Sequence, residues 1–181
     1  MQGKKYIGLV TIALSALMAC NSNQQATETK DTTALAVTDT TAVNALSFSD
    51  EKLQNIYNTY IKLKDELVGT KYETAKPAAT DLSVALKGFE GCENAAKIAS
   101  KIAEAKDIKA QRAAFTDLNV ELIPVFKHAA LTSGTIYVQH CPMANNGDGG
   151  DWLSSEKKIQ NPYYGDEMME CGRIAEEIKA K

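Results

Sequence analysis

The chain has 181 residues, of which 44% are hydrophobic and 24% charged, a composition typical of one globular domain of ordinary size. Its net charge of -3 argues against a nucleic-acid-binding protein, which would show an excess of basic residues. The two histidines, His128 and His140, are too few for a three-histidine zinc centre.

Residues 1–19 have the pattern of an export signal. Lys4 and Lys5 give a short basic start, and the apolar run over 7–19 is too short to span a bilayer as a normal helix. The run ends in small residues, as signal peptides do. The sequence therefore predicts an exported protein.

The end of this signal is Leu17-Met18-Ala19-Cys20, which resembles a bacterial lipobox, where the modified Cys follows a Leu by three positions. The resemblance implies cleavage before Cys20 and lipid on its sulfur, so that lipid chains hold the protein at a membrane. Asn21 stands where an inner-membrane retention signal would place Asp, which favours the outer membrane and the periplasm. The alternative is a plain secretory signal followed by a chance cysteine.

Residues 20–47 read as the lipidated Cys and a flexible tether. From residue 21 the stretch is mostly Asn, Gln, Thr, Ser and Ala, and it contains no Trp and no Tyr. It cannot bury enough apolar surface to offset the entropy lost on ordering. The folded domain is therefore expected over residues 48–181.

Apolar residues recur at three- and four-residue steps in four successive segments of this domain, which predicts four amphipathic helices. Ser47 or Ser49 is expected to cap the first helix, and Asp107 the fourth. Pro124 should kink the fourth helix near its end. The four helices are expected over about residues 50–68, 73–87, 93–106 and 107–126. Their short connections predict an all-α fold, an antiparallel four-helix bundle.

The pattern changes after Gly134, where we expect an irregular, turn-rich C-terminal segment. Residues 135–139 form a short strand-like run, and turn-forming residues dominate the stretch after it. This segment nevertheless holds the only Trp, one of the two His and two of the four Cys. Chemically special side chains on irregular backbone indicate a site built beside a scaffold.

Soft metal donors dominate this segment. Cys141 and Met143 are two residues apart, while Met168 and Cys171 are three apart and would share one face of a helical turn. Thiolate and thioether sulfurs select Cu(I) over hard cations, and His140 could add an imidazole. These five residues are the candidate metal ligands.

Other interpretations of the same residues remain open. A Cys is commonly a small buried hydrophobe and a Met a filler of irregular cores. Cys141 and Cys171 could instead form a disulfide, because exported proteins meet an oxidising compartment. Cys92 is expected to be buried or free. No nucleophile has a visible base and orienting partner, so we expect no enzyme.

Four motifs in this segment resemble the C-terminal signature of a bacterial family of domains of unknown function, whose members are exported and often lipidated. The motifs are Tyr137–Ala144, Trp152–Ser154, Asn161–Gly165 and Met168–Gly172. A similar domain is appended to periplasmic adaptor subunits of copper/silver efflux systems of the RND type. The resemblance covers about residues 50–178. It implies a link to heavy-metal efflux and supports the interpretation of the four sulfurs as ligands.

Two functions of different classes remain possible. The first is a lipid-anchored protein that binds Cu(I) or Ag(I) and buffers it or passes it to a periplasmic efflux adaptor. The second is a non-metal structural or protein-interaction module with a Cys141–Cys171 disulfide. The metal interpretation needs the sulfurs of Cys141, Met143, Met168 and Cys171 to converge, whereas the disulfide interpretation needs only the two cysteines close and the methionines in the core.

Overall fold

The computed structural model describes residues 46–181. The predicted signal peptide, Cys20 and nearly all of the predicted tether lie outside this range. Within it, four helices come first: α1 (Glu51–Val68), α2 (Tyr72–Lys87), α3 (Glu93–Ala103) and α4 (Ile108–His128). The strands are β1 (Ser47–Phe48), β2 (Leu131–Ser133), β3 (Thr135–Cys141), β4 (Gly150–Ser154) and β5 (Arg173–Lys179). Two short 3-10 helices are η1 (Asn145–Gly147) and η2 (Gly165–Glu167).

The four predicted helices are confirmed, with small changes at their ends. The N-cap of α1 is Asp50 rather than either serine, because its carboxylate accepts the backbone N–H groups of Lys52 at 2.7 Å and Leu53 at 3.3 Å. Asp107 caps α4 as expected and accepts the N–H of Ala110 at 2.7 Å. Each helix buries one apolar stripe, as its residue spacing requires.

The prediction of an all-α bundle is wrong. The segment after α4 forms a three-stranded antiparallel sheet in the order β4-β3-β5, and its strand β2 pairs antiparallel with β1, which precedes α1. The strand-like run at residues 135–139 is the start of β3. Strands β4 and β5 were hidden in the sequence because neither alternates apolar and polar residues: Trp152 and Leu153 are both buried, while β5 is largely exposed.

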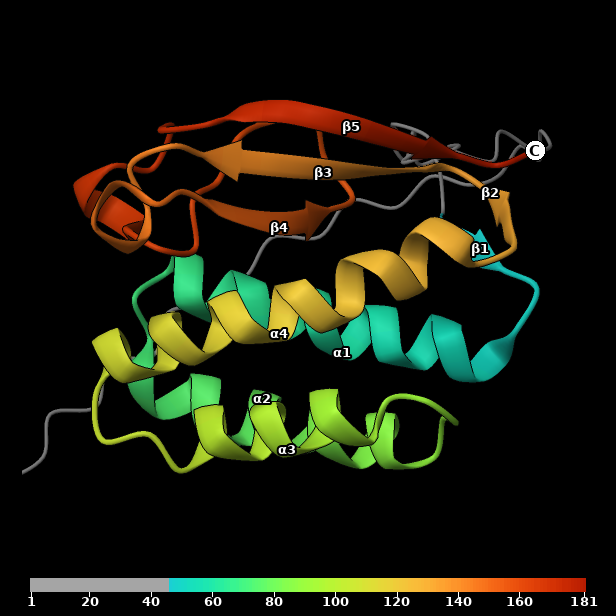
Figure 1. Ribbon diagram of the computed structural model, residues 1–181, viewed down its shortest axis with the longest axis horizontal. Coiled ribbons are helices and arrows are strands. Elements are labelled where there is room, and N and C mark those ends of the chain that lie inside the picture. Colours follow the sequence, from blue (N-terminus) through green and yellow to red (C-terminus); the bar gives the residue numbers. More distant parts are fainter. Residues whose placement is uncertain (1–45) are drawn as a thin grey trace, which may run out of the picture. The chain divides into compact units, whose positions relative to one another are not determined.

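The three-stranded sheet lies on the side of the helices formed by α1 and α4, and α2 and α3 lie farther from it (Figure 1). The phenol of Tyr60 in α1 accepts the backbone N–H of Leu153 in β4 at 2.9 Å. Tyr60 also donates to Asn119 of α4 at 2.6 Å, and all three residues are buried. One hydrogen-bonded chain therefore joins α4, α1 and the sheet.

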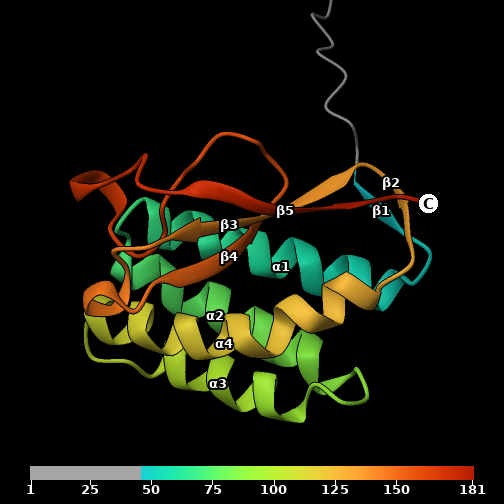
Figure 2. The ribbon, with the colours of Figure 1, turned by 45° about the horizontal axis from the view of Figure 1, so that its top comes forward.

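The other face of the sheet is covered by the segment of residues 155–160, which arches over it (Figure 2). Gln139 projects from β3 into this arch and donates to the carbonyl oxygens of Glu156 at 2.8 Å and Lys158 at 3.2 Å. Successive residues of a strand face opposite sides, so Trp152 lies under the arch while Leu153 lies on the helices. This explains why two consecutive large residues are both buried.

Within residues 46–181, no helix combines the length and the apolar character that crossing a membrane requires.

Candidate functional site

The two cysteines of the C-terminal half meet at one end of the sheet. Cys141 is the last residue of β3, and Cys171 lies two residues before β5. Because β3 and β5 pair antiparallel, with His140 opposite Arg173, the turn that leads into β5 comes back beside the end of β3. The two Sγ atoms are 2.9 Å apart, although the residues are 30 positions apart in the chain, and both are free thiols.

The two thiols differ in their surroundings. Cys141 is fully buried, while Cys171 is partly exposed to solvent. The pKa of the Cys171 thiol is raised, first because it shares a hydrogen bond with the Cys141 sulfur and then because it is partly desolvated. The backbone N–H of Met143 has the opposite effect and lowers the pKa of the Cys171 thiol. The pair therefore has one outer sulfur and one inner sulfur.

Both candidate methionines lie beside this pair in the chain and outside the core. Met143 is 54% exposed, and its backbone N–H lowers the pKa of the nearby Cys171 thiol. Met168 is partly exposed, and its carbonyl oxygen accepts the N–H of Cys171 at 3.1 Å. The structure thus brings the two thiols into contact and places the backbone of each methionine near Cys171.

The separation of the two sulfurs can be compared with that of a metal-bound thiolate pair and with that of a disulfide. Two sulfurs that bind one ion at about 2.3 Å each, the length of a zinc–thiolate bond, lie about 3.8 Å apart at a tetrahedral angle. The observed separation is 2.9 Å, so binding requires the sulfurs to separate by about 1 Å. A disulfide, at about 2.05 Å, requires them to approach by a similar amount. The observed sulfur–sulfur distance therefore lies between the distance in a metal-bound pair and that in a disulfide.

His140 lies away from the thiols, on the other face of β3. It is next to Cys141 in the strand, so the two side chains point to opposite sides. Its Nδ1 atom is hydrogen-bonded to the carboxylate of Asp151 on β4 at 2.8 Å. The imidazole lines an open groove of about 320 Å³ against α4, whose wall includes Val120 and Ile123.

Aromatic rings lie on the buried side of the thiol pair. Trp152 and Tyr163 are buried with their ring centroids 6.0 Å apart. The phenol of Tyr163 donates to the carbonyl oxygen of Asp151 at 2.6 Å and accepts from Asn119 at 3.2 Å, and burial raises its pKa. Tyr164 donates its hydroxyl hydrogen to the carbonyl oxygen of Met143 and so anchors the turn after Cys141.

The motif Asn161–Gly165 is a structural connection between the arch and the helices. Asn161 is fully buried, donates to the carbonyl oxygen of Cys171 at 2.9 Å and accepts the N–H of Tyr163 at 2.8 Å. Arg112 of α4 donates to the carbonyl oxygen of Pro162 at 2.8 Å. This contact was not predicted, because an arginine on a helix face carries no local signal of a partner 50 residues away.

The loop of residues 145–151 is a polar turn held by side-chain hydrogen bonds. The amide of Asn145 donates to the carbonyl oxygen of Gly149 at 2.8 Å, and its oxygen accepts from Thr116 at 3.0 Å. Cys92 is a buried free thiol in the helical core, as expected. Across residues 46–181, no three side chains of His, Cys, Asp or Glu are grouped so that they could share a metal ion.

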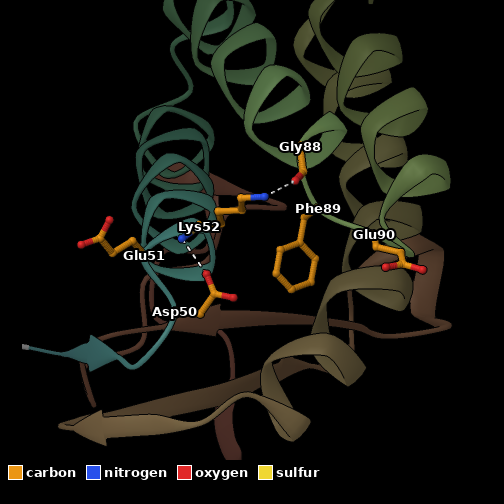
Figure 3. A pocket seen from close by; sticks show the side chains of 6 residues that line it. All are labelled: Asp50, Glu51, Lys52, Gly88, Phe89 and Glu90. Atoms are coloured by element: carbon orange, nitrogen blue, oxygen red, sulfur yellow. Dashed lines mark hydrogen bonds between the residues drawn. The ribbon is translucent and has the colours of Figure 1, made fainter.

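Another hollow, with a volume of about 680 Å³, lies at the start of α1 (Figure 3). Its polar groups are already paired: Asp50 caps α1, and the amine of Lys52 donates to the carbonyl oxygen of Gly88 at 3.2 Å. Figure 3 shows the carboxylates of Glu51 and Glu90 on opposite sides of this hollow. The groups around it do not converge on one point, so we assign it no role.

Part of the chain is similar to a known protein family. Residues 56–134 match the model of a family described as "Protein of unknown function (DUF3347)", which agrees with the predicted resemblance to a family of domains of unknown function. The match spans most of α1, all of α2 to α4, and β2, but it does not include the motifs of β3 to β5. No curated protein matches the chain, and no solved structure does.

Proposed function

We propose that this protein binds a soft metal ion, Cu(I) or Ag(I), through the thiolates of Cys141 and Cys171. The observation that carries the proposal is the 2.9 Å contact between two thiols that are 30 residues apart in the chain. Thiolate pairs prefer soft ions to hard cations such as Mg²⁺ or Ca²⁺. The role is one of binding rather than of catalysis.

Met143 and Met168 are the proposed supplementary donors. Their location outside the core favours this role, because a methionine that merely filled the core would be buried. His140 is a weaker candidate as a ligand to the same ion, since its ring nitrogen is bonded to Asp151 on the opposite face of the strand. The proposed donor set is therefore two thiolates assisted by thioethers.

The biological setting of the proposal comes from the N-terminal sequence. A lipid on Cys20 would hold the protein at the outer membrane, facing the periplasm, where it buffers the ion or passes it to a periplasmic efflux adaptor. The anchor is tested separately: Cys20→Ser should release the protein from membranes or block its processing. Unchanged membrane fractionation together with an unmodified Cys20 in mass spectrometry would contradict it.

The metal proposal is tested by competition between the reduced full chain and a Cu(I) chelator. Cys141→Ser and Cys171→Ser should each abolish stoichiometric binding, because each removes a charged ligand. Met143→Leu and Met168→Leu should weaken binding by about tenfold, the lower end of what changes around a metal ligand cost. Cys92→Ser, which removes a distant buried thiol, is the matched control and should bind like the wild type.

Two results would contradict the proposal. The first is a wild-type chain that takes up no copper under reducing conditions. The second is copper affinity that remains at the wild-type value in both variants of the pair. Circular dichroism of each variant separates loss of a ligand from loss of the fold.

A second candidate function is a structural or protein-interaction module closed by a Cys141–Cys171 disulfide. The same contact favours it, because closing the bond needs a movement of about 1 Å. It differs from the first candidate in its response to reduction. The disulfide-bonded form has no thiolate to offer a metal. A chain that binds its protein partner only when it is oxidised would therefore favour the module.

A further inference from the structure

We propose that Cys141 and Cys171 form a reversible dithiol–disulfide couple in which external thiols exchange through the Cys171 sulfur, with Cys141 as the internal partner. The partner class is a protein dithiol of the kind that reduces disulfides. This inference does not depend on metal binding, because it rests on the contact and the unequal exposure of the two sulfurs.

The two sulfurs differ in their access to solvent. Thiol–disulfide exchange requires an attacking thiolate to approach one of the two sulfurs directly, so the exposed sulfur determines where the reaction occurs. Cys141 is fully buried beside the ring of Tyr163 and the backbone of Gly150, its partner on β4. Cys171 lies on the turn before β5 and is partly exposed. An external thiolate can therefore reach Cys171 and is excluded from Cys141.

The two cysteines also differ in how they are attached to the fold. Cys141 is held by a strand that pairs on both sides, with β4 and with β5. Cys171 belongs to a turn that is attached through the Met168 carbonyl oxygen and through Asn161, and its neighbour Glu170 is exposed. When the bond between them opens, Cys171 can move outward with its turn while Cys141 stays in the sheet.

The exchange has two steps. A thiolate of the external dithiol attacks Cys171 Sγ, the Cys141–Cys171 bond breaks, and the electron pair goes to Cys141 Sγ, which takes up a proton. The second thiol of the partner then attacks its own sulfur in the mixed disulfide and releases Cys171, which takes up a proton in turn. The partner leaves as a disulfide, so two electrons and two protons have passed to this chain.

As a consequence, the pair can be oxidised or reduced through the partly exposed Cys171 while the core stays folded. Exposed disulfides are more readily reduced than buried structural ones. The same asymmetry places a mixed disulfide at the surface, where a small thiol such as glutathione fits without unfolding the sheet. Cys92, buried in the helical core, is not expected to take part.

The test maps the mixed disulfide on the full chain. We oxidise the wild type, add glutathione, block the free thiols by rapid alkylation and locate glutathione by mass spectrometry. The expected result is glutathione on Cys171 and alkylation on Cys141. A wild type that never forms the Cys141–Cys171 bond with glutathione disulfide, or that carries glutathione on Cys141, would overturn the proposal.

Two single-cysteine variants provide a rate comparison. The Cys141→Ser chain, which keeps Cys171, should react with glutathione disulfide at least about tenfold faster than the Cys171→Ser chain, because accessibility limits the buried thiol. In denaturant the two rates should become equal, which shows that the difference belongs to the fold. Equal rates in the folded chains, with circular dichroism confirming that both are folded, would contradict the assignment of Cys171.

Discussion

The helical half of the domain, α1 to α4, and the strand half, β2 to β5, are held together in different ways. The helices pack through stripes of buried apolar residues such as Leu63, Leu82 and Leu118. The regular spacing of these residues along each helix is enough to place them on one face. The strand half shares this apolar core through residues such as Val138 and Leu153, and it adds single polar contacts to the helices, such as the one from Arg112 to Pro162. The helical half therefore depends mainly on apolar burial, whereas the strand half depends on apolar burial and on individual hydrogen bonds.

Removing atoms should damage the helical half most. Leu118 is fully buried in α4, so Leu118→Ala should lower the free energy of unfolding by about 2–5 kcal/mol. Val120, two residues away and 69% exposed, is the control, and Val120→Ala should stay within about 0.5 kcal/mol of the wild type. Urea unfolding measures both, and similar losses would mean that the buried face is wrongly assigned.

Adding atoms should damage the strand half. Gly165 has φ of +57°, and a Cβ placed there would lie 2.7 Å from the Arg112 guanidinium and 2.8 Å from the Val68 carbonyl oxygen. Gly165→Ala should therefore cost about 2–4 kcal/mol, of which roughly 1 kcal/mol is the left-handed backbone and the rest is overpacking.

Gly91 is the matched control for this substitution. It also has a positive φ, +84°, but a Cβ there would meet nothing within 4 Å. Gly91→Ala should thus cost only the backbone contribution of roughly 1 kcal/mol. Equal losses of unfolding free energy for the two variants would mean that the close approach of Arg112 and Val68 does not limit the residue at position 165.

Two Tyr→Phe substitutions compare polar anchoring in the two halves. Tyr163→Phe should cost about 1–3 kcal/mol, because it leaves the buried polar groups around Asp151 and Asn119 without their phenol partner. Tyr57 is also buried, but its hydroxyl has no hydrogen-bond partner among residues 46–181. Tyr57→Phe should therefore be neutral or slightly stabilising, and a loss as large as that of Tyr163→Phe would contradict this assignment.

The same phenols predict an alkaline limit to stability. Burial is the main cause of the raised pKa of Tyr57, Tyr60 and Tyr163, whereas in the unfolded chain each should titrate near 10. Above about pH 10 the unfolded state therefore binds fewer protons than the folded state, and the unfolding free energy falls by up to about 1.4 kcal/mol per pH unit for each phenol. Tyr57→Phe should make this decline shallower. An unchanged slope would mean that Tyr57 does not contribute.

The helices were predictable because their stripes repeat locally, and the strands were less so because their burial depends on distant segments. Trp152 and Leu153 are both buried only because the arch covers one face of β4 and the helices cover the other. Glu176 and Glu177 in β5 lie on a strand that has little cover on either face. No alternation could mark either strand, so the segment looked irregular.

The two cysteines of the candidate site could be singled out from the sequence, but the arrangement of the residues around them could not. The spacing of soft donors pointed to Cys141 and Cys171, and the structure brings them into contact. The separation of His140 from Cys141 follows from the alternation of a strand longer than the one expected. The role of Asn161 is set by a turn that returns to it from Cys171, which no local pattern encodes.

The short sheet of β1 and β2 determines where a force on the N-terminal part of the chain would enter the domain. Phe48 pairs with Leu131 and Ser47 with Ser133, so the chain joins the domain at the end of α4 and the start of β3. Cys141 ends β3, six residues after Thr135, about 20 Å along the strand. A force applied to the chain before residue 46 would therefore act first on the pairing of β1 with β2. It would reach Cys141 and Cys171, at the opposite end of β3, only after that pairing had separated.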